Sequence, residues 1–221
     1  MTIIDGASQR LARYAELISP EDIRERTGRI RNAVARMSEL IDTTLNTARL
    51  DDGRIEIDVA PLDLVELVTG VARRMAGTAP EFEIAVSAQV STLRIEADAV
   101  LLEQEFTNLL SNAIKYSGAH RRVEIVVDAR DADAVVAVRD QGIGIPTDEI
   151  PKLFGRFFRA STAKGLPGTG IGLNLVRELV ALQGGAVAVE SVAGEGSIFT
   201  VTLPMTRAKT GGAAQSPVAA D

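Results

Sequence analysis

The chain has 221 residues with 24 Lys and Arg, 30 Asp and Glu and a net charge of -6, which argues against nucleic acid as a general partner. It has no cysteine and one histidine, His120, which excludes disulfides, thiol chemistry and a zinc cluster. No apolar run approaches the roughly 20 residues that span a bilayer, and the N-terminus lacks a secretory signal. We therefore expect a cytoplasmic chain that makes no membrane contact itself.

The first 50 residues predict an antiparallel pair of helices. Apolar residues recur at helical spacing from Ile3 to Ile18, and Ser19-Pro20 is typical of the start of a second helix. The apolar positions of that second helix, from Ile23 to Ala48, step mostly by three and four. One hairpin cannot bury such a stripe alone. We expect residues 1–50 to form a homodimer; packing of the hairpin against its own chain is the alternative.

Residues 51–204 alternate between strand and helix patterns. This order predicts an α+β protein, a two-layer α/β sandwich in which helices cover one face of a mixed sheet. The small and polar residues at 205–221 predict a disordered tail. The expected strands are 54–58, 83–90, 93–95, 123–129, 135–140, 186–190 and 197–203, and the expected helices are 62–75, 108–116 and 173–180.

The helix at 108–116 carries an unusual polar stripe. Because residues three and four apart share a helical face, Asn108, Asn112 and Lys115 lie together. An amide oxygen for magnesium, an ammonium for phosphate and a second amide at the reacting end suit a nucleoside triphosphate with its metal. The alternative is an ordinary solvated face, although asparagine is a poor helix former.

A carboxylate and a glycine pair follow the strand at 135–140. Asp140 ends that strand and Gly142 and Gly144 come directly after it. An ionised carboxylate only accepts hydrogen bonds, which matches the exocyclic amine of adenine, whereas guanine presents an acceptor there. The alternative is that Asp-x-Gly-x-Gly is only turn chemistry.

A second glycine cluster, at 168–172, opens the helix at 173–180. Its unpaired backbone N–H groups and the helix dipole favour phosphate. The spacing is not that of the dinucleotide fingerprint, and no Gly-Lys dipeptide is present for a P-loop.

Residues 108–116, 140–145, 153–159 and 168–173 resemble, in order and spacing, the N, G1, F and G2 boxes of sensor histidine kinases. The resemblance covers residues 55–204 and implies the Bergerat ATP-binding fold, ATP and Mg²⁺ as cofactors and protein histidine kinase activity in two-component signalling. The hairpin resembles the family's dimerisation and histidine-phosphotransfer domain without its H box. The resemblance therefore implies transfer of the γ-phosphoryl group to a histidine not present in this chain, and then to a response regulator receiver domain. We expect His120 to be an exposed loop histidine.

The resemblance also implies roles for single residues. Asn112 would be the magnesium ligand, Lys115 a phosphate contact and Tyr116 a ring near the adenine. Asp140 would hold the adenine amine. Asn108 would be catalytic, because related ATPases place there a glutamate that activates water, and an amide favours transfer over hydrolysis.

The remaining implied nucleotide-binding residues come from the other boxes. Residues 159–167 resemble a short mobile lid, in which Arg159, with Arg156 and Lys164, would neutralise phosphate charge. Gln141 replaces the asparagine most common in the G1 box. Thr200, in the last strand, would support Asp140 through water. The others are Gly142, Gly144, Ile145, Gly168, Thr169, Gly170, Gly172 and Leu173.

Two other functions stay open. One is a gyrase-type or chaperone-type ATPase, against which Asn108 argues and which steady-state turnover would reveal. The other is a non-catalytic, dimeric adaptor with a vestigial nucleotide pocket, which Mg-ATP would not stabilise against heat.

Overall fold

The computed structural model describes residues 57–206 except 119 and 167, together with residues 19, 21–24, 26–28 and 30. Residues 21–24, 26–28 and 30 are helical, and the backbone N–H of Asp22 donates to Ser19 Oγ at 3.1 Å, as expected for an N-cap. The rest of the hairpin at 1–50, and the predicted tail from 207 onward, lie outside the described residues.

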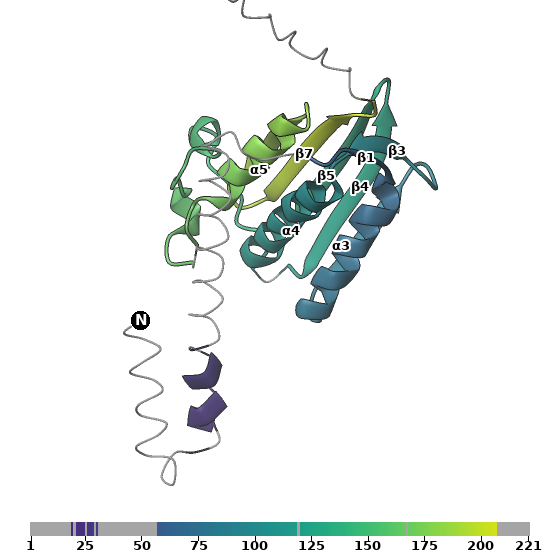
Figure 1. Cartoon of the computed structure of the whole chain (residues 1–221). Coiled ribbons are helices and arrows are strands. Elements are labelled where there is room, and N and C mark those ends of the chain that lie inside the picture. The colour runs from purple at the N-terminus through teal and green to yellow at the C-terminus, as the bar shows by residue number, and fades with distance from the viewer. Residues whose placement is uncertain are drawn as a thin grey trace, which may run out of the picture.

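The domain is built on a five-stranded mixed sheet in the order β2-β4-β5-β7-β6. Figure 1 labels β4, β5 and β7 of this sheet. β2 pairs with β4 in parallel, and the other neighbours are antiparallel. A separate antiparallel pair joins β1 to β3. The strands are β1 (Ala60–Asp63), β2 (Glu83–Ala88), β3 (Arg94–Ala97), β4 (Arg122–Arg130), β5 (Asp133–Asp140), β6 (Ala186–Val192) and β7 (Gly196–Pro204).

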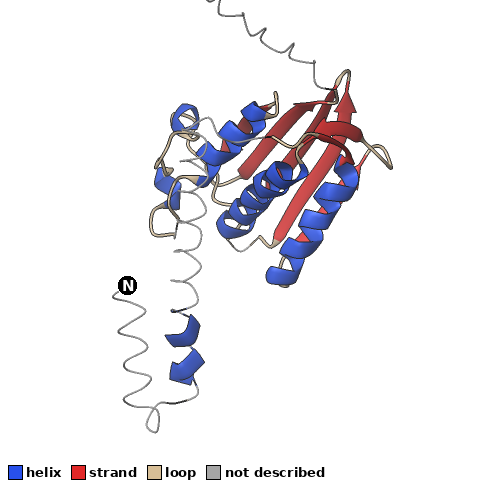
Figure 2. Cartoon of the chain, in the orientation of Figure 1, coloured by secondary structure: helices blue, strands red, loops and turns tan. Residues whose placement is uncertain are grey.

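Three helices cover one face of the sheet, as Figure 2 shows. They are α3 (Leu64–Thr78), α4 (Ala99–Tyr116) and α5 (Gly172–Leu182). Two of them start at capping carboxylates: Asp63 accepts from the N–H of Val65, and Asp98 accepts from the N–H groups of Val100 and Leu101. No helix in the described part of the chain is both long and apolar enough to cross a membrane.

The core lies between the helices and the inner face of the sheet. Along β7, buried residues alternate with half-buried ones, as a strand with one covered face requires. The apolar side of α4 is completely buried against them, and each such large side chain contributes about 1.5–3 kcal/mol relative to exposure. These core residues include Leu102, Phe106, Leu109, Val136, Val138, Val201 and Leu203.

The predicted two-layer sandwich is confirmed, with one local difference. The strand predicted at 54–58 is wrong for its described residues, since Ile57 and Asp58 belong to no strand. The first strand among the described residues is β1, where Leu62 pairs with Ile95. The helix predicted at 62–75 accordingly starts at Leu64, because Asp63 caps it. Two short 3₁₀ turns, Ile150–Lys152 and Ser161–Ala163, lie between β5 and α5.

Candidate functional site

A cavity of about 900 Å³ opens beside the C-terminal half of α4. Its walls come from α4, the end of β5, residues 143–145, the chain between residues 153 and 170, the start of α5 and the start of β7. The α4 wall is polar and consists of Asn108, Ser111, Asn112, Lys115 and Tyr116.

The polar stripe of α4 is turned toward the cavity by the packing of the opposite side. Leu109, Leu110 and Ala113 are buried in the core. The stripe of Asn108, Asn112 and Lys115 lies on the other side of the helix, where it lines the cavity. The side-chain amide of Asn108 donates to the carbonyl of Gln104 at 3.0 Å, which leaves its oxygen to the cavity. Lys115 Nζ lies 4.7 Å from the centre of the Tyr116 ring, a cation–π distance.

Asp140 lines the cavity at the end of β5. Its side chain is buried, and its Oδ1 accepts from the N–H of Gly142 at 2.8 Å. Burial raises the pKa of the Asp140 carboxyl, while backbone hydrogen bonds from Gly142 and Ser197 act in the opposite direction. The cavity therefore holds a fixed, partly desolvated acceptor of the kind that recognises an amine.

The G1 loop (residues 141–145) is fixed on both sides. The N–H of Ile143 donates to the carbonyl of Tyr116 at 3.1 Å, and the carbonyl of Ile143 accepts from Gly194 at 2.8 Å. Gly144 has a φ of +60°, and a Cβ there would lie 2.0 Å from the carbonyl oxygen of Val192. Only glycine allows this approach of the loop to the β6–β7 turn.

The lid segment (residues 159–166) covers another side of the cavity. Arg159 donates from its guanidinium to the carbonyls of Ala163, at 2.9 Å, and Leu166. Thr162 donates to the carbonyl of Gly144 at 2.8 Å. Arg159 thus organises the lid segment through one of its terminal nitrogens, Nη2, and it also lines the cavity.

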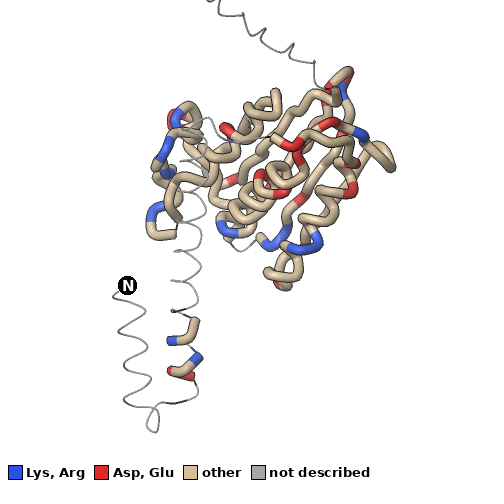
Figure 3. Tube along the Cα trace, in the orientation of Figure 1, with Lys and Arg blue, Asp and Glu red and all other residues tan. Residues whose placement is uncertain are grey.

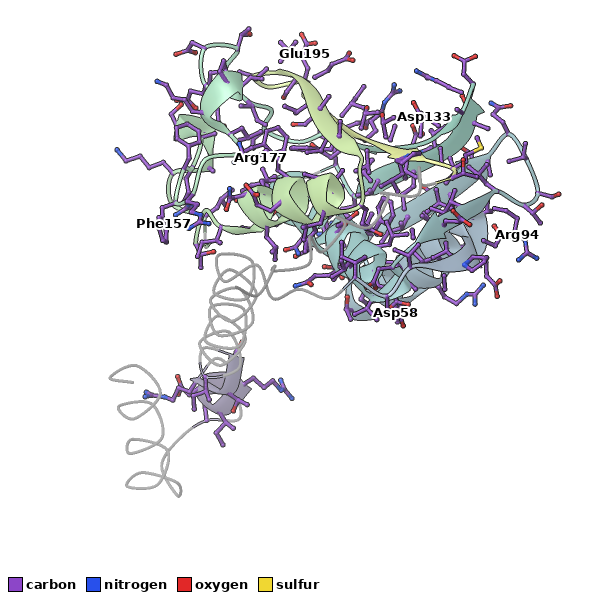
Figure 4. The ribbon with its side chains drawn as sticks, turned by 45° about the horizontal axis from the view of Figure 1, so that its top comes forward. Asp58, Arg94, Asp133, Phe157, Arg177 and Glu195 are labelled. Carbon is purple, nitrogen blue, oxygen red and sulfur yellow. The ribbon has the colours of Figure 1, made fainter. Side chains whose placement is uncertain are left out.

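Lys and Arg positions recur on the chain between β5 and α5, in blue at the left of Figure 3. Lys152, Arg156 and Lys164 are exposed there. Phe157, in the same stretch, is 72% exposed and projects from the edge of the domain in Figure 4. The positive charge lies next to the cavity but, apart from Arg159, outside its lining.

The structure brings most of the predicted site residues together. Gly142 does not line the cavity, but its N–H holds Asp140. Arg156 lies outside the lining. The predicted residues that do line the cavity are Asn108, Asn112, Lys115, Tyr116, Asp140, Gly144, Ile145, Arg159, Gly168, Thr169, Gly170, Gly172 and Leu173.

The position of Thr200 differs from the prediction. Thr200 pairs with Ala137, three residues before Asp140, and is half-buried on the face of β7 that alternates with the buried one. The residue beside Asp140 is Ser197, which pairs with it and lines the cavity. Thr200 lies three residues after Ser197 in β7, and an odd offset along a strand places the two side chains on opposite faces of the sheet.

Sequence reasoning missed several lining residues. Ser111 could have been found, because it lies three residues after Asn108 and four before Lys115 on the same stripe. Ser197 and Phe199 could not, since the strand register brings them to the cavity. The other missed residues are Ile143, Leu153, Phe158, Ala160, Thr162, Ala163, Gly165 and Leu166.

Neither a metal cluster nor a catalytic histidine is found in the described part of the chain. No group of three or more His, Cys, Asp or Glu side chains there could hold a metal ion. His120 is exposed, as predicted, and its backbone N–H donates to the carbonyl of Ser117.

Residues 97–207 match the family of histidine kinase-, DNA gyrase B- and HSP90-like ATPases. The mycobacterial sensor histidine kinase MprB shares the fold with a TM-score of 0.60 and 30% identity, over 66% of this chain and 97% of the MprB chain. The chain belongs to the sensor histidine kinases. Its matched residues, 97–207, lie in the ATP-binding catalytic domain of that family.

Longer relatives match nearly all of this sensor histidine kinase chain. The circadian input-output histidine kinase CikA of Synechococcus elongatus is 33% identical over 211 residues, which are 92% of this chain and 28% of CikA. Full-length ShkA, solved in complex with AMPPNP, has a TM-score of 0.71 and 30% identity over 94% of this chain and 44% of its own. The chain thus spans less than half the length of CikA and of ShkA.

We expect alanine substitutions at Gly165 and Gly144 to differ in their cost to stability, because only the second adds a steric clash to the strain of positive φ. Gly165 has a φ of +89° with no atom near its missing Cβ, whereas Gly144 combines positive φ with the carbonyl of Val192. Gly165→Ala should lower the free energy of unfolding by about 1–2 kcal/mol, and Gly144→Ala by about 2–5 kcal/mol. Urea denaturation measures both; equal losses would contradict the role given to Gly144.

Proposed function

We propose that this chain is the ATP-binding and dimerisation portion of a two-component sensor histidine kinase, and that it transfers the γ-phosphoryl group of ATP to a histidine outside the chain. The observation that carries the proposal is the juxtaposition of Asn112 and Lys115 with Asp140 on the walls of one cavity. The polar stripe suits the triphosphate end of a nucleotide and the buried carboxylate suits its base.

In this proposal the base lies at the G1 loop. Asp140 accepts from the exocyclic amine of adenine, and the Tyr116 ring lies near the base. Gly142 and Ser197 hold the carboxylate through their backbone N–H groups, so its orientation is fixed before the nucleotide arrives. Guanine would place an acceptor against this acceptor and bind less well.

The phosphates lie between α4 and the glycines at the start of α5. Lys115 supplies an ammonium, and the N-terminal end of α5, from Gly172, supplies unpaired N–H groups and the positive end of its dipole. Gly168 allows the lysine into this position, because a Cβ there would lie 2.4 Å from Lys115 Nζ. We propose that Arg159 contributes positive charge through the N–H groups that the lid carbonyls do not use.

The donor set fits a magnesium ion that is bound together with the nucleotide. Asn112 offers a neutral oxygen to the cavity, and the described residues contain no carboxylate cluster that would bind the ion alone. This is the donor pattern of Mg²⁺, which takes one or two protein ligands beside phosphate oxygens and water. When bound, the ion would neutralise charge on the phosphates.

Asn108 favours transfer over hydrolysis. Its amide donates to Gln104 and, unlike a carboxylate, cannot take a proton from water. A gyrase-type hydrolase therefore lacks its general base here. The intact cavity argues against a vestigial pocket in a non-catalytic adaptor, although that alternative predicts the same fold.

We further propose the arrangement of the whole chain. Residues 1–50 form a partial phosphotransfer hairpin through which two copies dimerise, residues 51–204 form the ATP-binding domain, and residues 205–221 are a tail. A response regulator receiver domain would take the phosphoryl group from the phosphohistidine, and the chain would work in the cytoplasm. Membership of the sensor histidine kinases supports these assignments.

For Asn112→Ala we expect loss of the magnesium-dependent part of nucleotide binding with the fold retained. The side chain lines the cavity, and removal of its oxygen takes away the one ligand that the chain is proposed to give the ion. Calorimetric titration with AMPPNP, with and without Mg²⁺, measures the effect. The matched control is Thr107→Ala, because Thr107 is exposed on the same helix. Unchanged magnesium dependence in Asn112→Ala would reject the ligand assignment.

Radiolabelled ATP tests the phosphotransfer itself. The chain alone should gain no acid-labile label, because its only histidine is the exposed His120. A purified dimerisation and phosphotransfer domain of a relative, with its H box intact, should become labelled when the chain is added. Strong labelling of the chain alone, abolished by His120→Ala, would contradict the proposal, and steady phosphate release without transfer would favour a hydrolase.

A further inference from the structure

A chain of buried polar groups runs through the domain outside the cavity lining. Asp98, Glu105 and Gln183 are 6%, 0% and 2% exposed. Asp98 caps the start of α4, Glu105 lies two turns further along that helix, and Gln183 follows the end of α5. None of them has a part in nucleotide binding, so their burial needs another explanation.

The three side chains form a continuous path from the segment before β1 to both helices. The N–H of Asp58 donates to Asp98 Oδ2 at 3.0 Å. The N–H of Asp98 donates to Gln183 Oε1 at 2.8 Å, and Gln183 Nε2 donates to Glu105 Oε1 at 2.8 Å. A side-chain amide can do this, because it offers an acceptor and a donor at once.

An apolar contact lies beside this path. Ile57 packs on a small cluster made by Leu101 of α4 and Leu175 and Leu179 of α5, with Leu182 at its edge. Two successive residues therefore attach the segment before β1 to the helices. Ile57 packs against apolar side chains of α4 and α5, and Asp58 donates a hydrogen bond to Asp98 at the start of α4.

Both helices also reach the cavity. Asn108 lies three residues after Glu105 on α4, and Gly172 and Leu173, at the opposite end of α5 from Gln183, line the cavity. Since a helix moves largely as a unit, a shift of α4 relative to α5 changes the cavity and the path together.

Glu105 is the buried titratable group at the inner end of the path. Its Oε2 has no hydrogen-bond partner. Burial raises the pKa of the Glu105 carboxyl from 4.5 to about 8, the hydrogen bond from Gln183 lowers it and the charge of Asp98 raises it. The charge that raises the pKa of Glu105 is that of Asp98, the N-cap of α4. The neighbour at the end of α5 is the neutral side chain of Gln183. Glu105 is thus protonated near pH 7, and a neutral carboxyl accepts from Gln183.

We propose that Asp98, Gln183 and Glu105, together with Ile57, form a linker clamp through which the segment that enters the domain at residue 57 and the nucleotide in the cavity affect each other. The inference rests on the proposed function for its nucleotide. It names Gln183 and Glu105 as positioning residues, distinct from the residues that contact ATP.

Amide hydrogen exchange at Asp58, read by NMR on the full chain, tests the clamp. Binding sites that share a two-state element are coupled reciprocally. Saturating Mg-AMPPNP should therefore slow exchange at the Asp58 amide by about fivefold or more, the lower end of typical coupling. Asp98→Asn should abolish this protection. The side-chain oxygen of the asparagine can still cap α4, but its NH₂ group replaces the oxygen that accepts from the N–H of Asp58. Gln183→Leu should do the same by breaking the two inner bonds.

The control is Glu103→Gln, which removes a charge from an exposed site two residues before Glu105. It should leave the protection unchanged. AMPPNP binding, followed by calorimetry in the same samples, separates the possible failures. If AMPPNP binds normally but the Asp58 amide is not protected, the clamp alone is overturned. The same holds if protection persists in both Asp98→Asn and Gln183→Leu. No binding to the unaltered chain overturns the proposed function and the clamp with it.

The pH dependence of the melting temperature tests the role of Glu105 separately. Because the folded pKa of Glu105 exceeds its unfolded value, the folded state holds a proton that the unfolded state has lost, so stability falls between about pH 4.5 and 8 and levels off above. Glu105→Gln mimics the protonated carboxyl. It should remove this fall in melting temperature, whereas Glu103→Gln should keep it. Identical pH profiles for Glu105→Gln and Glu103→Gln would overturn the role of Glu105.

Discussion

The burial of one side of α4 against the sheet determines where the site can be. Leu102, Phe106 and Leu109 are completely buried, and at about 1.5–3 kcal/mol for each side chain their packing fixes the rotation of the helix. The stripe of Asn108, Asn112 and Lys115 must then face away from the sheet. The G1 loop, the lid segment and the start of α5 close around that stripe, so the cavity is a consequence of the core.

The sheet supplies the second requirement, since it brings a distant carboxylate to the same cavity. Asp140 ends β5, and its neighbours in space are the end of α4 and the first residues of β7. The close contacts of the G1 loop with Tyr116 and with the β6–β7 turn hold it there. The contacts proposed for the base and for the phosphates therefore lie on different elements around one cavity. The linker clamp connects these elements to the segment that precedes the domain.

Much of the fold could be predicted because local pattern and burial agree. The alternation in β5 and β7 and the two faces of α4 reflect the covered face of the sheet directly. Residues whose position depends on pairing were the difficult ones. Ser197 and Phe199 reach the cavity through the register of β7 with β5, and the same register pairs Thr200 with Ala137 and not with Asp140. The buried Glu105 could not be recognised, because its partner Gln183 lies 78 residues away in the sequence.

The central claim is that α4, the G1 loop and the glycines before α5 form one adenine nucleotide site. The most direct test is a titration of the isotope-labelled chain with Mg-AMPPNP, followed by amide NMR. The account predicts that signals of residues 108–116, 141–145 and 168–173 shift together, with a single dissociation constant, and that GTP does not reproduce these shifts. Shifts confined to one of these segments, or equal responses to the two nucleotides, would contradict it.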